Sequence, residues 1–411
     1  MDFVVLLVFV AVYVGMMLGR FPGLALDRTG AALLGAVMLL ASDRMTSEQA
    51  WASIDVPTIG LLLGLMIVSA QFRLAGVYDV MTRRLAEAPL SPVNLLGLLI
   101  LVAGGLSAVL ANDIVCLAMT PILIQGCLKR RMDPLPFLLG LACAANVGSA
   151  ATLIGNPQNM LIGQKLSVSF AGYLLDAVVP AILGMLATWG IIAWMYRGRW
   201  IQADDAPVVA MDAGQLVGTQ PVRPWHAGKA TAILLGLVIA FIVTDRPRDV
   251  MALAAGGLIL LSRHTATHKF LDLVDWQLLV LFISLFIVNH ALEASGWLAH
   301  LMGILRDTGV DLSQPATLFG VTAVLSNLVS NVPAVMLLLP AADGPAAPAI
   351  LALSSTLAGN FILVGSIANL IVVSQAQKMN VRITFWEHAK TGIPVTLATL
   401  ALAGLWLWIR Y

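Results

Sequence analysis

Apolar runs of spanning or near-spanning length recur from residue 3 to the last residues of this 411-residue chain. Hydrophobic residues make up 59% of it and charged residues only 11%, against roughly a quarter in an ordinary soluble domain. Inside a bilayer no water satisfies the backbone, so each run is expected to form a helix. The chain is therefore predicted to be an all-α polytopic membrane protein. The first run, 3–18, has no basic segment before it and no cleavage site after it, and is expected to be retained.

Several function classes are excluded by composition and motifs. The formal net charge of +1 argues against a nucleic-acid partner. No GxxxxGK[ST] phosphate-binding loop occurs, so the chain is not expected to hydrolyse ATP. Its three cysteines, Cys116, Cys127 and Cys143, lie in apolar context, which argues against a disulfide framework. We expect neither an enzyme nor a bound cofactor or metal.

Three sequence blocks occur twice, in the same order. "DVPTIGLLLGLMIVSAQFRLAG" from Asp55 pairs with "DWQLLVLFISLFIVNHALEASG" from Asp275, and both aspartates are expected to be helix N-caps. "SAVLANDIVCLAMTP" (107–121) pairs with "SNLVSNVPAVMLLLP" (326–340). "ATLIGNPQNMLI" (151–162) pairs with "FILVGSIANLIV" (361–372). Leucine-rich segments align by chance, but the polar residues inside these blocks do not, so we interpret the chain as a duplication.

The duplication predicts a first membrane repeat (1–196), a cytoplasmic linker (197–229) and a second membrane repeat (230–411). Each repeat contains five apolar runs that are candidate transmembrane helices. In the first repeat they fall at 3–19, 29–42, 56–75, 135–162 and 173–196, and in the second at 230–244, 250–262, 275–294, 348–376 and 390–410. A further run in each repeat, 94–128 or 314–341, is long enough for a re-entrant helical hairpin whose polar midpoint is a repeated asparagine.

Charge placement predicts the orientation of the repeats. If the N-terminus lies outside and each hairpin returns to the side it left, most of the 23 Lys and Arg residues fall inside, as the positive-inside rule requires. With five full spans in the first repeat, the second enters from the opposite side, so the repeats are inverted. We predict an inner-membrane protein with both termini periplasmic. Hairpins that cross the membrane fully give the same loop placement, and both layouts stay open.

Inverted repeats with matching polar interruptions are typical of secondary transporters, whose substrate site lies near the midplane where broken helices meet. Opposed hairpin tips would bring Asn112 and Asn331 toward two breaks, at 146–159 and 355–369. We expect Asn112 to cap a helix at its tip. The alternative is that these polar residues only join helices. The candidate substrate-binding residues are Asn112, Asn146, Ser149, Thr152, Gly155, Asn156, Asn159, Asn327, Asn331, Gly365, Ser366 and Asn369.

Asp113 breaks the match between the repeats, because Val332 occupies its place in the second one. A carboxylate in a membrane interior is costly and is by default a functional hypothesis. Burial disfavours its charged form, which permits proton uptake and release near neutral pH, so we predict that Asp113 couples transport to protons. The alternative is an ion pair with an Arg or Lys at the hairpin mouth. His290 and Glu293, one helical turn apart, form a second candidate relay.

The tip "ANDIVCLAMTPI" and the stretch "LVGSIANLIVVSQAQKMNVRITFWEHAKTG" (363–392) resemble the ion transporter superfamily, and within it the arsenite permeases. The resemblance covers essentially the whole chain and extends to the related divalent anion/sodium symporters. It implies proton-coupled efflux of arsenite or antimonite, sometimes with a separate ATPase subunit, and a site built from the residues named above. A homodimer is also compatible with it.

Other branches remain alternatives. The segment "GNPQN" (155–159) also resembles the "GDPPN" pattern found elsewhere in the superfamily, which keeps open a small anion carrier, for di- or tricarboxylates or inorganic anions, and a sodium/proton antiporter. A channel without coupled turnover is a further alternative. Trivalent arsenic binds thiolates, and Cys116 and Cys143 lie near the tip and the first break. We favour structural packing for both, with the hydroxide recognised by Asn, Ser and backbone groups.

Overall fold

The computed structural model describes residues 2–19, 25–201, 222–262 and 265–411. Regular structure in these residues is helical, apart from isolated bridges such as that between Met132 and Ile201. The first half contains α1 (Phe3–Leu18), α2 (Arg28–Ala41), α3 (Ser47–Ser53), α4 (Val56–Leu74), α5 (Val77–Glu87), α6 (Pro92–Val109), α7 (Asn112–Lys129), α8 (Leu135–Ser149), α9 (Pro157–Lys165) and α10 (Phe170–Met195). The second half contains α11 (Pro224–Val243), α12 (Arg248–Leu260), α13 (Thr267–Leu271), α14 (Trp276–Ala294), α15 (Trp297–Asp307), α16 (Pro315–Val329), α17 (Asn331–Leu338), η2 (Leu339–Ala341), α18 (Ala347–Ala358), η3 (Leu363–Gly365), α19 (Ile367–Lys378) and α20 (Phe385–Arg410). Of the predicted linker 197–229, residues 202–221 lie outside the described residues.

The two long helices α4 and α14 begin at the predicted caps. Asp55 Oδ1 accepts a hydrogen bond from the Thr58 amide, and Asp275 Oδ1 accepts one from the Leu278 amide, both at 2.9 Å. A free amide at a helix start is satisfied in this way, so both N-cap predictions are confirmed. After each helix the chain turns at a glycine with positive φ before α5 or α15 begins.

Both predicted interruptions occur. The run 135–162 is divided into α8 and α9 by non-helical residues 150–156, and the run 348–376 into α18 and α19 by a stretch that contains η3. The runs proposed as hairpins form the antiparallel pairs α6–α7 and α16–α17, and the second turns at Ser330 with φ 78°. The prediction that Asn112 caps a helix is wrong. Ala111 occupies the N-cap position and Asn112 is the first residue of α7, because the chain turns one residue earlier.

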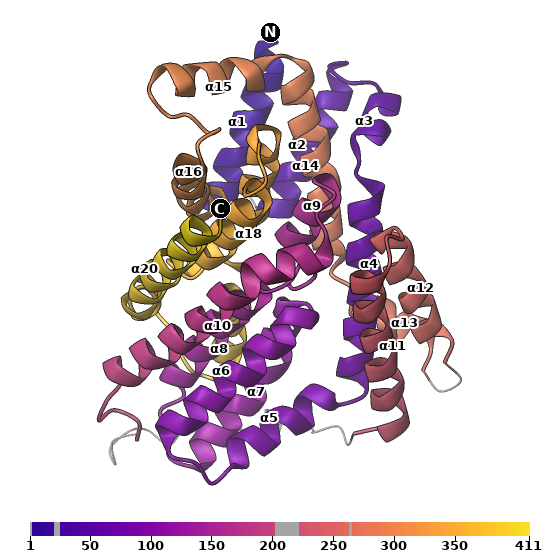
Figure 1. The fold of residues 1–411 in the computed structure, drawn as a ribbon. Coiled ribbons are helices and arrows are strands. Elements are labelled where there is room, and N and C mark those ends of the chain that lie inside the picture. The colour runs from indigo at the N-terminus through magenta and orange to yellow at the C-terminus, as the bar shows by residue number, and fades with distance from the viewer. Residues whose placement is uncertain (1, 20–24, 202–221, 263–264) are drawn as a thin grey trace.

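The halves match in the order of their helices and in their packing. α4 packs on α12 of the other half, and α14 packs reciprocally on α2. α6 packs on α8 as α16 packs on α18, and the long helices α10 and α20 pack on each other. Figure 1 shows the short helices α5 and α15 at opposite ends of the molecule. Reciprocal packing is what a duplicated chain predicts, and the inversion of the repeats across a membrane stays a prediction.

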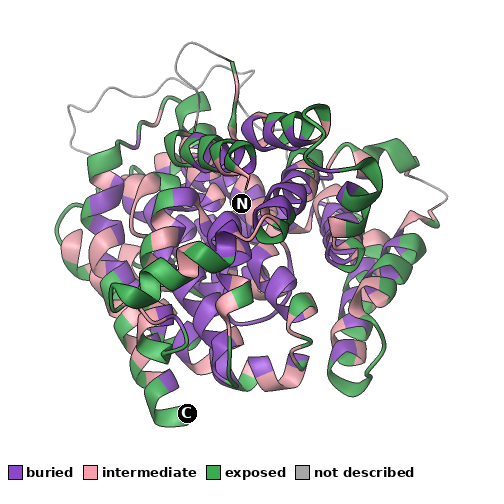
Figure 2. Ribbon diagram, turned by 90° about the horizontal axis from the view of Figure 1, so that it is seen from above, coloured by how far each residue is buried: buried purple, intermediate pink, exposed green. Residues whose placement is uncertain are grey.

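The outer surface of the helix bundle is apolar. Six of the described helices, α4, α6, α10, α11, α14 and α20, are long and apolar enough to cross a membrane. Large side chains on their outer faces are exposed, such as Leu235, Ile239 and Val243 on α11. Figure 2 shows buried residues concentrated in the interior and exposed ones around the rim. An apolar exposed rim fits a lipid environment, and the candidate site lies inside it.

A candidate substrate site between the hairpin tips and the helix breaks

The two hairpin tips and the two breaks enclose one small central cavity of about 30 Å³. This volume is close to the share of one water molecule in the liquid. The central cavity is lined by Asn112, Asp113, Asn156, Pro157, Gln158, Ser330, Asn331, Val332, Ser366 and Ile367. The structure therefore brings together five of the predicted residues: Asn112, Asp113, Asn156, Asn331 and Ser366.

Four helices, α7, α9, α17 and α19, begin at the central cavity. α9 and α19 are capped, because Asn156 Oδ1 accepts from the Asn159 amide at 2.9 Å and Ser366 Oγ accepts from the Ala368 amide at 3.2 Å. α7 and α17 begin without a side-chain cap. A helix N-terminus carries partial positive charge and free N–H groups. The two hairpin helices therefore present uncapped N-termini to the cavity, where oxygen atoms of a solute are favoured.

Asn146, on α8, joins the two halves behind the cavity. Its Oδ1 accepts from Ser366 Oγ at 2.8 Å and from Asn112 Nδ2 at 3.4 Å. Its Nδ2 donates to Asn360 Oδ1 at 2.7 Å and to Asn369 Oδ1 at 3.2 Å. Asn146 does not line the cavity and is buried. It holds the first tip and the second break in register through four side chains.

Asn159 holds the first break together. Its Nδ2 donates to the backbone carbonyl of Thr152 at 2.9 Å and to that of Ser149 at 3.4 Å. The Thr152 hydroxyl donates to the Ala108 carbonyl near the first hairpin tip. Broken helices leave carbonyl groups without helical partners, and a buried unpaired carbonyl is costly. The amide of Asn159 therefore stabilises the non-helical backbone at this depth.

Asn369 performs the same task in the second break. Its Nδ2 donates to the Gly359 carbonyl at 2.9 Å and to the Ile362 carbonyl at 3.4 Å. These two carbonyls occupy the positions that match those bound by Asn159 when the third repeated block is aligned. The two asparagines predicted from the matched blocks thus form equivalent clamps.

Asn331, at the second tip, contacts both breaks. With its amide oriented so that each end has a partner, Nδ2 donates to the carbonyls of Ser355 and Gly365 at 3.1 and 3.2 Å, and Oδ1 accepts from Gln158 Nε2 at 3.3 Å. Gln158 also donates to Thr356 Oγ1 at 3.1 Å. The second tip is therefore bound to its own break by backbone contacts and to the first break through Gln158.

Two predicted glycines and one predicted asparagine have structural surroundings. A Cβ on Gly155 would lie 2.3 Å from the Ser149 carbonyl oxygen, and one on Gly365 would lie 3.0 Å from Asn327 Oδ1. A side chain at position 155 would therefore force the backbone of the first break to shift, whereas one at position 365 would need its neighbours to give slightly. Asn327 Nδ2 donates to the Ala323 carbonyl at 3.0 Å, and its buried Oδ1 has no partner among the described residues. These three residues shape the site without lining it.

Sequence reasoning missed several members of this network. Tyr173, on α10, accepts from Asn159 Nδ2 at 3.1 Å. His388 takes the matching place on α20, with Nε2 3.4 Å from Asn369 Nδ2 and 3.2 Å from the Asn360 carbonyl oxygen. Both residues are the fourth in their helices, so the equivalence of α10 and α20 was a signal that could have found them. Gln158, Ser330 and Thr356 lie inside the quoted polar stretches or beside a tip.

Asp113 faces the central cavity and also a larger cavity of about 240 Å³. The larger one shares Asn112 and Asp113 with it and reaches Arg73, Asp272 and Asp275. Among the described residues, no hydrogen bond or ion pair is formed by the Asp113 carboxyl group. The alternative of a structural ion pair at the hairpin mouth is therefore not what this part of the chain shows. Asp113 therefore borders both cavities, and the larger one extends toward the predicted cytoplasmic side.

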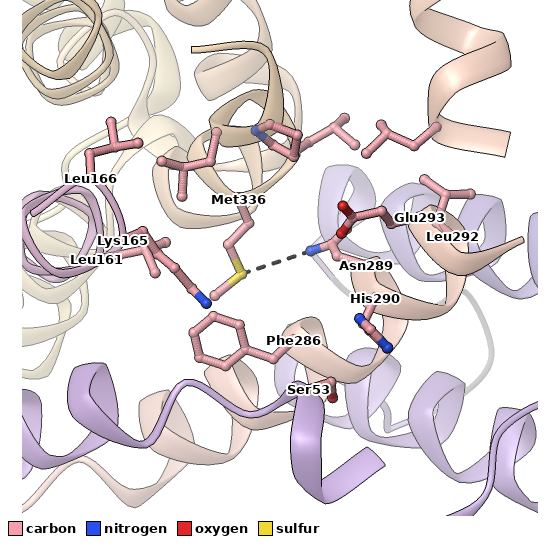
Figure 3. Close-up of a pocket in the computed structure, with 14 residues that line it drawn as sticks. Ser53, Leu161, Lys165, Leu166, Phe286, Asn289, His290, Leu292, Glu293 and Met336 are labelled. Atoms are coloured by element: carbon pink, nitrogen blue, oxygen red, sulfur yellow. Dashed lines mark hydrogen bonds between the residues drawn. The ribbon is translucent and has the colours of Figure 1, made fainter. Parts of the chain in front are cut away.

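A further cavity, of about 320 Å³, lies toward the opposite surface (Figure 3). Lys165, at the end of α9, points into it, with Nζ 5.7 Å from the centre of the Phe286 ring. Asn289 Nδ2 lies 3.8 Å from Met336 Sδ across it. Lys165 also forms an ion pair with Asp55 at 2.7 Å. Together these contacts hold α9, α14 and α17 against each other on this side.

His290 and Glu293 line this second large cavity and not the central one. Figure 3 shows both on α14, across the cavity from Lys165. None of the residues that line the central cavity lines this one. The structure thus separates the second candidate relay from Asp113.

The cysteine sulfurs also lie apart from the cavity. Cys116, Cys127 and Cys143 are buried and free, and none lines the central cavity. Cys143 contributes its carbonyl, which accepts from Asn360 Nδ2 at 3.3 Å. Amide, hydroxyl and backbone groups surround the cavity instead.

Among solved structures, the chain is similar in fold to the YdaH transporter of Alcanivorax borkumensis, whose crystal structure has an unusual topology. The TM-score is 0.55, with 14% sequence identity over 99% of this chain and 97% of that one. This likeness concerns the fold alone.

Relatives in sequence are transporters or membrane proteins. An uncharacterised transporter of Mycobacterium bovis is 30% identical over 100% of this chain and 99% of its own length. A silicon efflux transporter of rice, Oryza sativa subsp. japonica, is 30% identical over 94% of both chains. The inner membrane protein YbiR of Escherichia coli is 31% identical over 85% of this chain and 87% of its own.

A family model described as citrate transporter matches residues 4–350. The match covers both hairpin tips and the first break. It agrees with the predicted superfamily, while the arsenite-permease branch stays a prediction. With the fold and the relatives above, it shows that this chain is a multi-pass membrane transporter of the citrate transporter family.

Proposed function

We propose that the protein is a secondary active carrier that exports a small uncharged hydroxide, arsenite or antimonite, in exchange for protons bound by Asp113. One observation carries the proposal: a single carboxyl group lies in a central cavity where four helices begin and which, among the described residues, no Lys, Arg or His side chain lines. We place it in the inner membrane with periplasmic termini, as the charge distribution predicts. Neither an ATPase subunit nor a second copy is required for this chemistry.

The lining of the cavity suits a neutral hydroxide. Arsenite and antimonite at neutral pH carry O–H groups that both donate and accept hydrogen bonds. Amide side chains such as those of Asn112 and Asn331 offer both functions, and the uncapped starts of α7 and α17 offer N–H donors to the oxygens. No thiolate is needed, so release need not break a covalent arsenic–sulfur bond.

The same geometry explains how Asp113 can change charge. Burial opposes a carboxylate at this depth, whereas the positive ends of four helices favour it. These effects oppose each other, and the exchange that we propose requires Asp113 to adopt both forms. In the exchange that we propose, the solute binds when Asp113 is charged, because the carboxylate accepts hydrogen bonds from the O–H groups of the solute. Protonation of Asp113 then favours release of the solute.

A second candidate, a small anion, is favoured by the four helix N-termini and by the name of the family. A citrate-like solute brings several negative charges, however, and would meet Asp113 with no side-chain cation in the cavity. An anion would therefore bind with a protonated Asp113 and move in the same direction as the proton. Silicic acid is also a neutral hydroxide. We include it among the candidate solutes of the first kind because the relative in rice is a silicon efflux transporter.

The direction of the driving gradient tests these candidates. The full chain in liposomes would be given arsenite, antimonite, silicic acid, citrate, succinate or sulfate, with and without sodium. We expect arsenite or antimonite to accumulate when the lumen is acidic, because protons leave as the solute enters. Accumulation of an anion with an acidic exterior would contradict exchange and support symport. Flux that ignores the pH gradient would indicate a channel, and flux that needs sodium would indicate a different coupling ion.

A further inference from the structure

A basic pocket lies at the end of the molecule far from the hairpin tip, between α5 and the last turns of α7. Its volume is about 370 Å³, and it is lined by three cations, Arg83, Lys129 and Arg130, and by one carboxylate, Glu87. None of the ion pairs in the described part of the chain involves these four residues. We call it the α5–α7 pocket.

The cations of the α5–α7 pocket have different roles. Arg130 donates to the carbonyls of Ala86, Ala88 and Leu90 at 3.3, 2.9 and 2.7 Å. It satisfies the free carbonyls at the end of α5 and so builds the wall. Arg83 Nε is buried without a hydrogen-bond partner among the described residues, and Lys129 is exposed. Since an unpaired buried donor is costly, the pocket has unused capacity to bind an anion.

The position of the pocket favours a membrane lipid as the source of that anion. α5 is a short amphipathic helix with Tyr78, Thr82 and Leu85 buried, at one end of the bundle (Figure 1). Amphipathic helices of this kind lie in the membrane interface. The predicted topology places it at the cytoplasmic surface, where anionic lipid headgroups attract Lys and Arg.

The other half of the molecule carries a counterpart with the opposite charge. The pocket beside α15, of about 420 Å³, is lined by Glu293, Asp311 and Asp343 but by one cation, Arg306. Hydrogen bonds from Ser313 lower the pKa of Asp311, so that this carboxylate is charged at neutral pH. The equivalent place in the other half is therefore acidic, so the basic character of the α5–α7 pocket comes from its own side chains and not from its place in the fold.

We propose that the α5–α7 pocket binds the phosphate group of an anionic lipid, with Arg83 and Lys129 as its ligands. Lipid bound there would also brace the first hairpin, because α7 packs closely on α5. A Cβ on Gly126 would lie 2.3 Å from the Ala86 Cβ, which shows that close approach. The proposal does not depend on which solute is transported.

Native mass spectrometry of the full chain in neutral detergent tests the proposal. We expect the protein to retain phosphatidylglycerol in preference to phosphatidylcholine. Arg83→Gln and Lys129→Gln should each weaken phosphatidylglycerol binding about fivefold and leave phosphatidylcholine unchanged. Arg306→Gln in the acidic counterpart is the matched control and should have no effect. Equal retention of the two lipids, or an equal loss in the control, would overturn the proposal.

Two further measurements distinguish lipid binding from the binding of free phosphate and from an effect of misfolding. Inorganic phosphate alone should not be retained, and retention of it in place of phosphatidylglycerol would overturn the assignment to a lipid. Glu87→Gln removes the one carboxylate that lines the pocket and should tighten phosphatidylglycerol binding. Since Lys129 and Glu87 are exposed, these two variants test the charge without disturbing the packing of α5 on α7. Weaker binding in Glu87→Gln would contradict the proposal.

Discussion

The two hairpin tips occupy equivalent places in the fold but differ in charge. Each begins its second helix with an asparagine, Asn112 or Asn331, at the central cavity. The next residue is Asp113 in the first tip and Val332 in the second. The matched asparagines contact the breaks, whereas the unmatched carboxyl group has no partner among the described residues. The comparison teaches that the two tips share their architecture and that the first tip alone adds a carboxyl group at the cavity, to which we assign proton coupling.

The breaks show the same division. Asn159 and Asn369 clamp equivalent carbonyls. Asn146 is matched by Thr356, and each binds side chains of the opposite break. They differ in that Asn146 also binds a tip residue, Asn112. The two positions therefore share their role between the breaks and differ in the contact with a tip, and variants in matched pairs can test this difference.

The largest effect is expected from Asp113→Asn. This change keeps the shape and removes titration, so an acidic lumen should no longer drive accumulation, while exchange down the solute gradient continues. Accumulation of labelled arsenite in liposomes measures it. The control is Val332→Ala, which should keep proton-driven accumulation. Because Asp113 has no described ion-pair partner, thermal stability should change by much less than the roughly 3–5 kcal/mol of a broken buried ion pair. A loss of that size would show a structural role.

The next effect is expected from Asn146→Ala. It leaves buried groups on Asn360, Asn369 and Ser366 without a partner, at about 1–3 kcal/mol each before relaxation. We expect a clear fall in the melting temperature and loss of transport. Thr356→Ala is the matched change and removes a hydroxyl that bonds Asn156, Gln158 and Asn159. It should destabilise less, because Asn156 and Gln158 each keep another hydrogen bond. Equal melting temperatures for the two variants would contradict the larger structural role of Asn146.

The clamps should respond alike. Asn159→Ala and Asn369→Ala each remove an amide that binds two carbonyls, so each should lower the free energy of unfolding by a similar amount, about 1–3 kcal/mol. Thermal melting of both variants in the same detergent measures it. A difference of several kcal/mol between them would show that the breaks are not equivalent.

The smallest effect is expected from Lys165→Gln, which removes the ion pair with Asp55. Exposed pairs contribute about 0–1 kcal/mol. Burial alone would raise the pKa of Asp55, but hydrogen bonds from Lys165 and Thr58 lower it below its usual value. A lowered pKa gives stability that is present at neutral pH and lost as the pH falls through the carboxyl range. The variant should therefore melt slightly below the unchanged protein at neutral pH, and this deficit should shrink as the pH falls below the lowered pKa of Asp55. A deficit that persists in acid would contradict this role.

Much of the fold could be predicted from sequence because polar residues repeat at fixed places in apolar runs. The breaks, the hairpin-forming runs and the caps Asp55 and Asp275 follow from that pattern. The role of Asn112 could not be predicted from that pattern, because a shift of the turn by one residue decides whether Asn112 caps α7 or is its first residue. The short helices were not anticipated, since α3, α5, α13 and α15 lie in the polar connections between apolar runs.

The candidate site was predictable only in part. Matched blocks identified Asn156 and Ser366, which line the cavity, but gave no reason to pair Asn146 with Asn360. That contact joins residues far apart in sequence and depends on how the halves pack. Tyr173 and His388 were missed because they lie outside the three repeated blocks, although the equivalence of α10 and α20 offered a signal for them.

The central claim is that solute and proton compete at the cavity that contains Asp113. Proton release on solute binding tests it most directly, in weakly buffered detergent solution with a pH indicator. Addition of arsenite to the full chain should release protons near neutral pH, and Asp113→Asn should bind arsenite without release. Equal release by the variant, or proton uptake by the unchanged protein, would contradict the account.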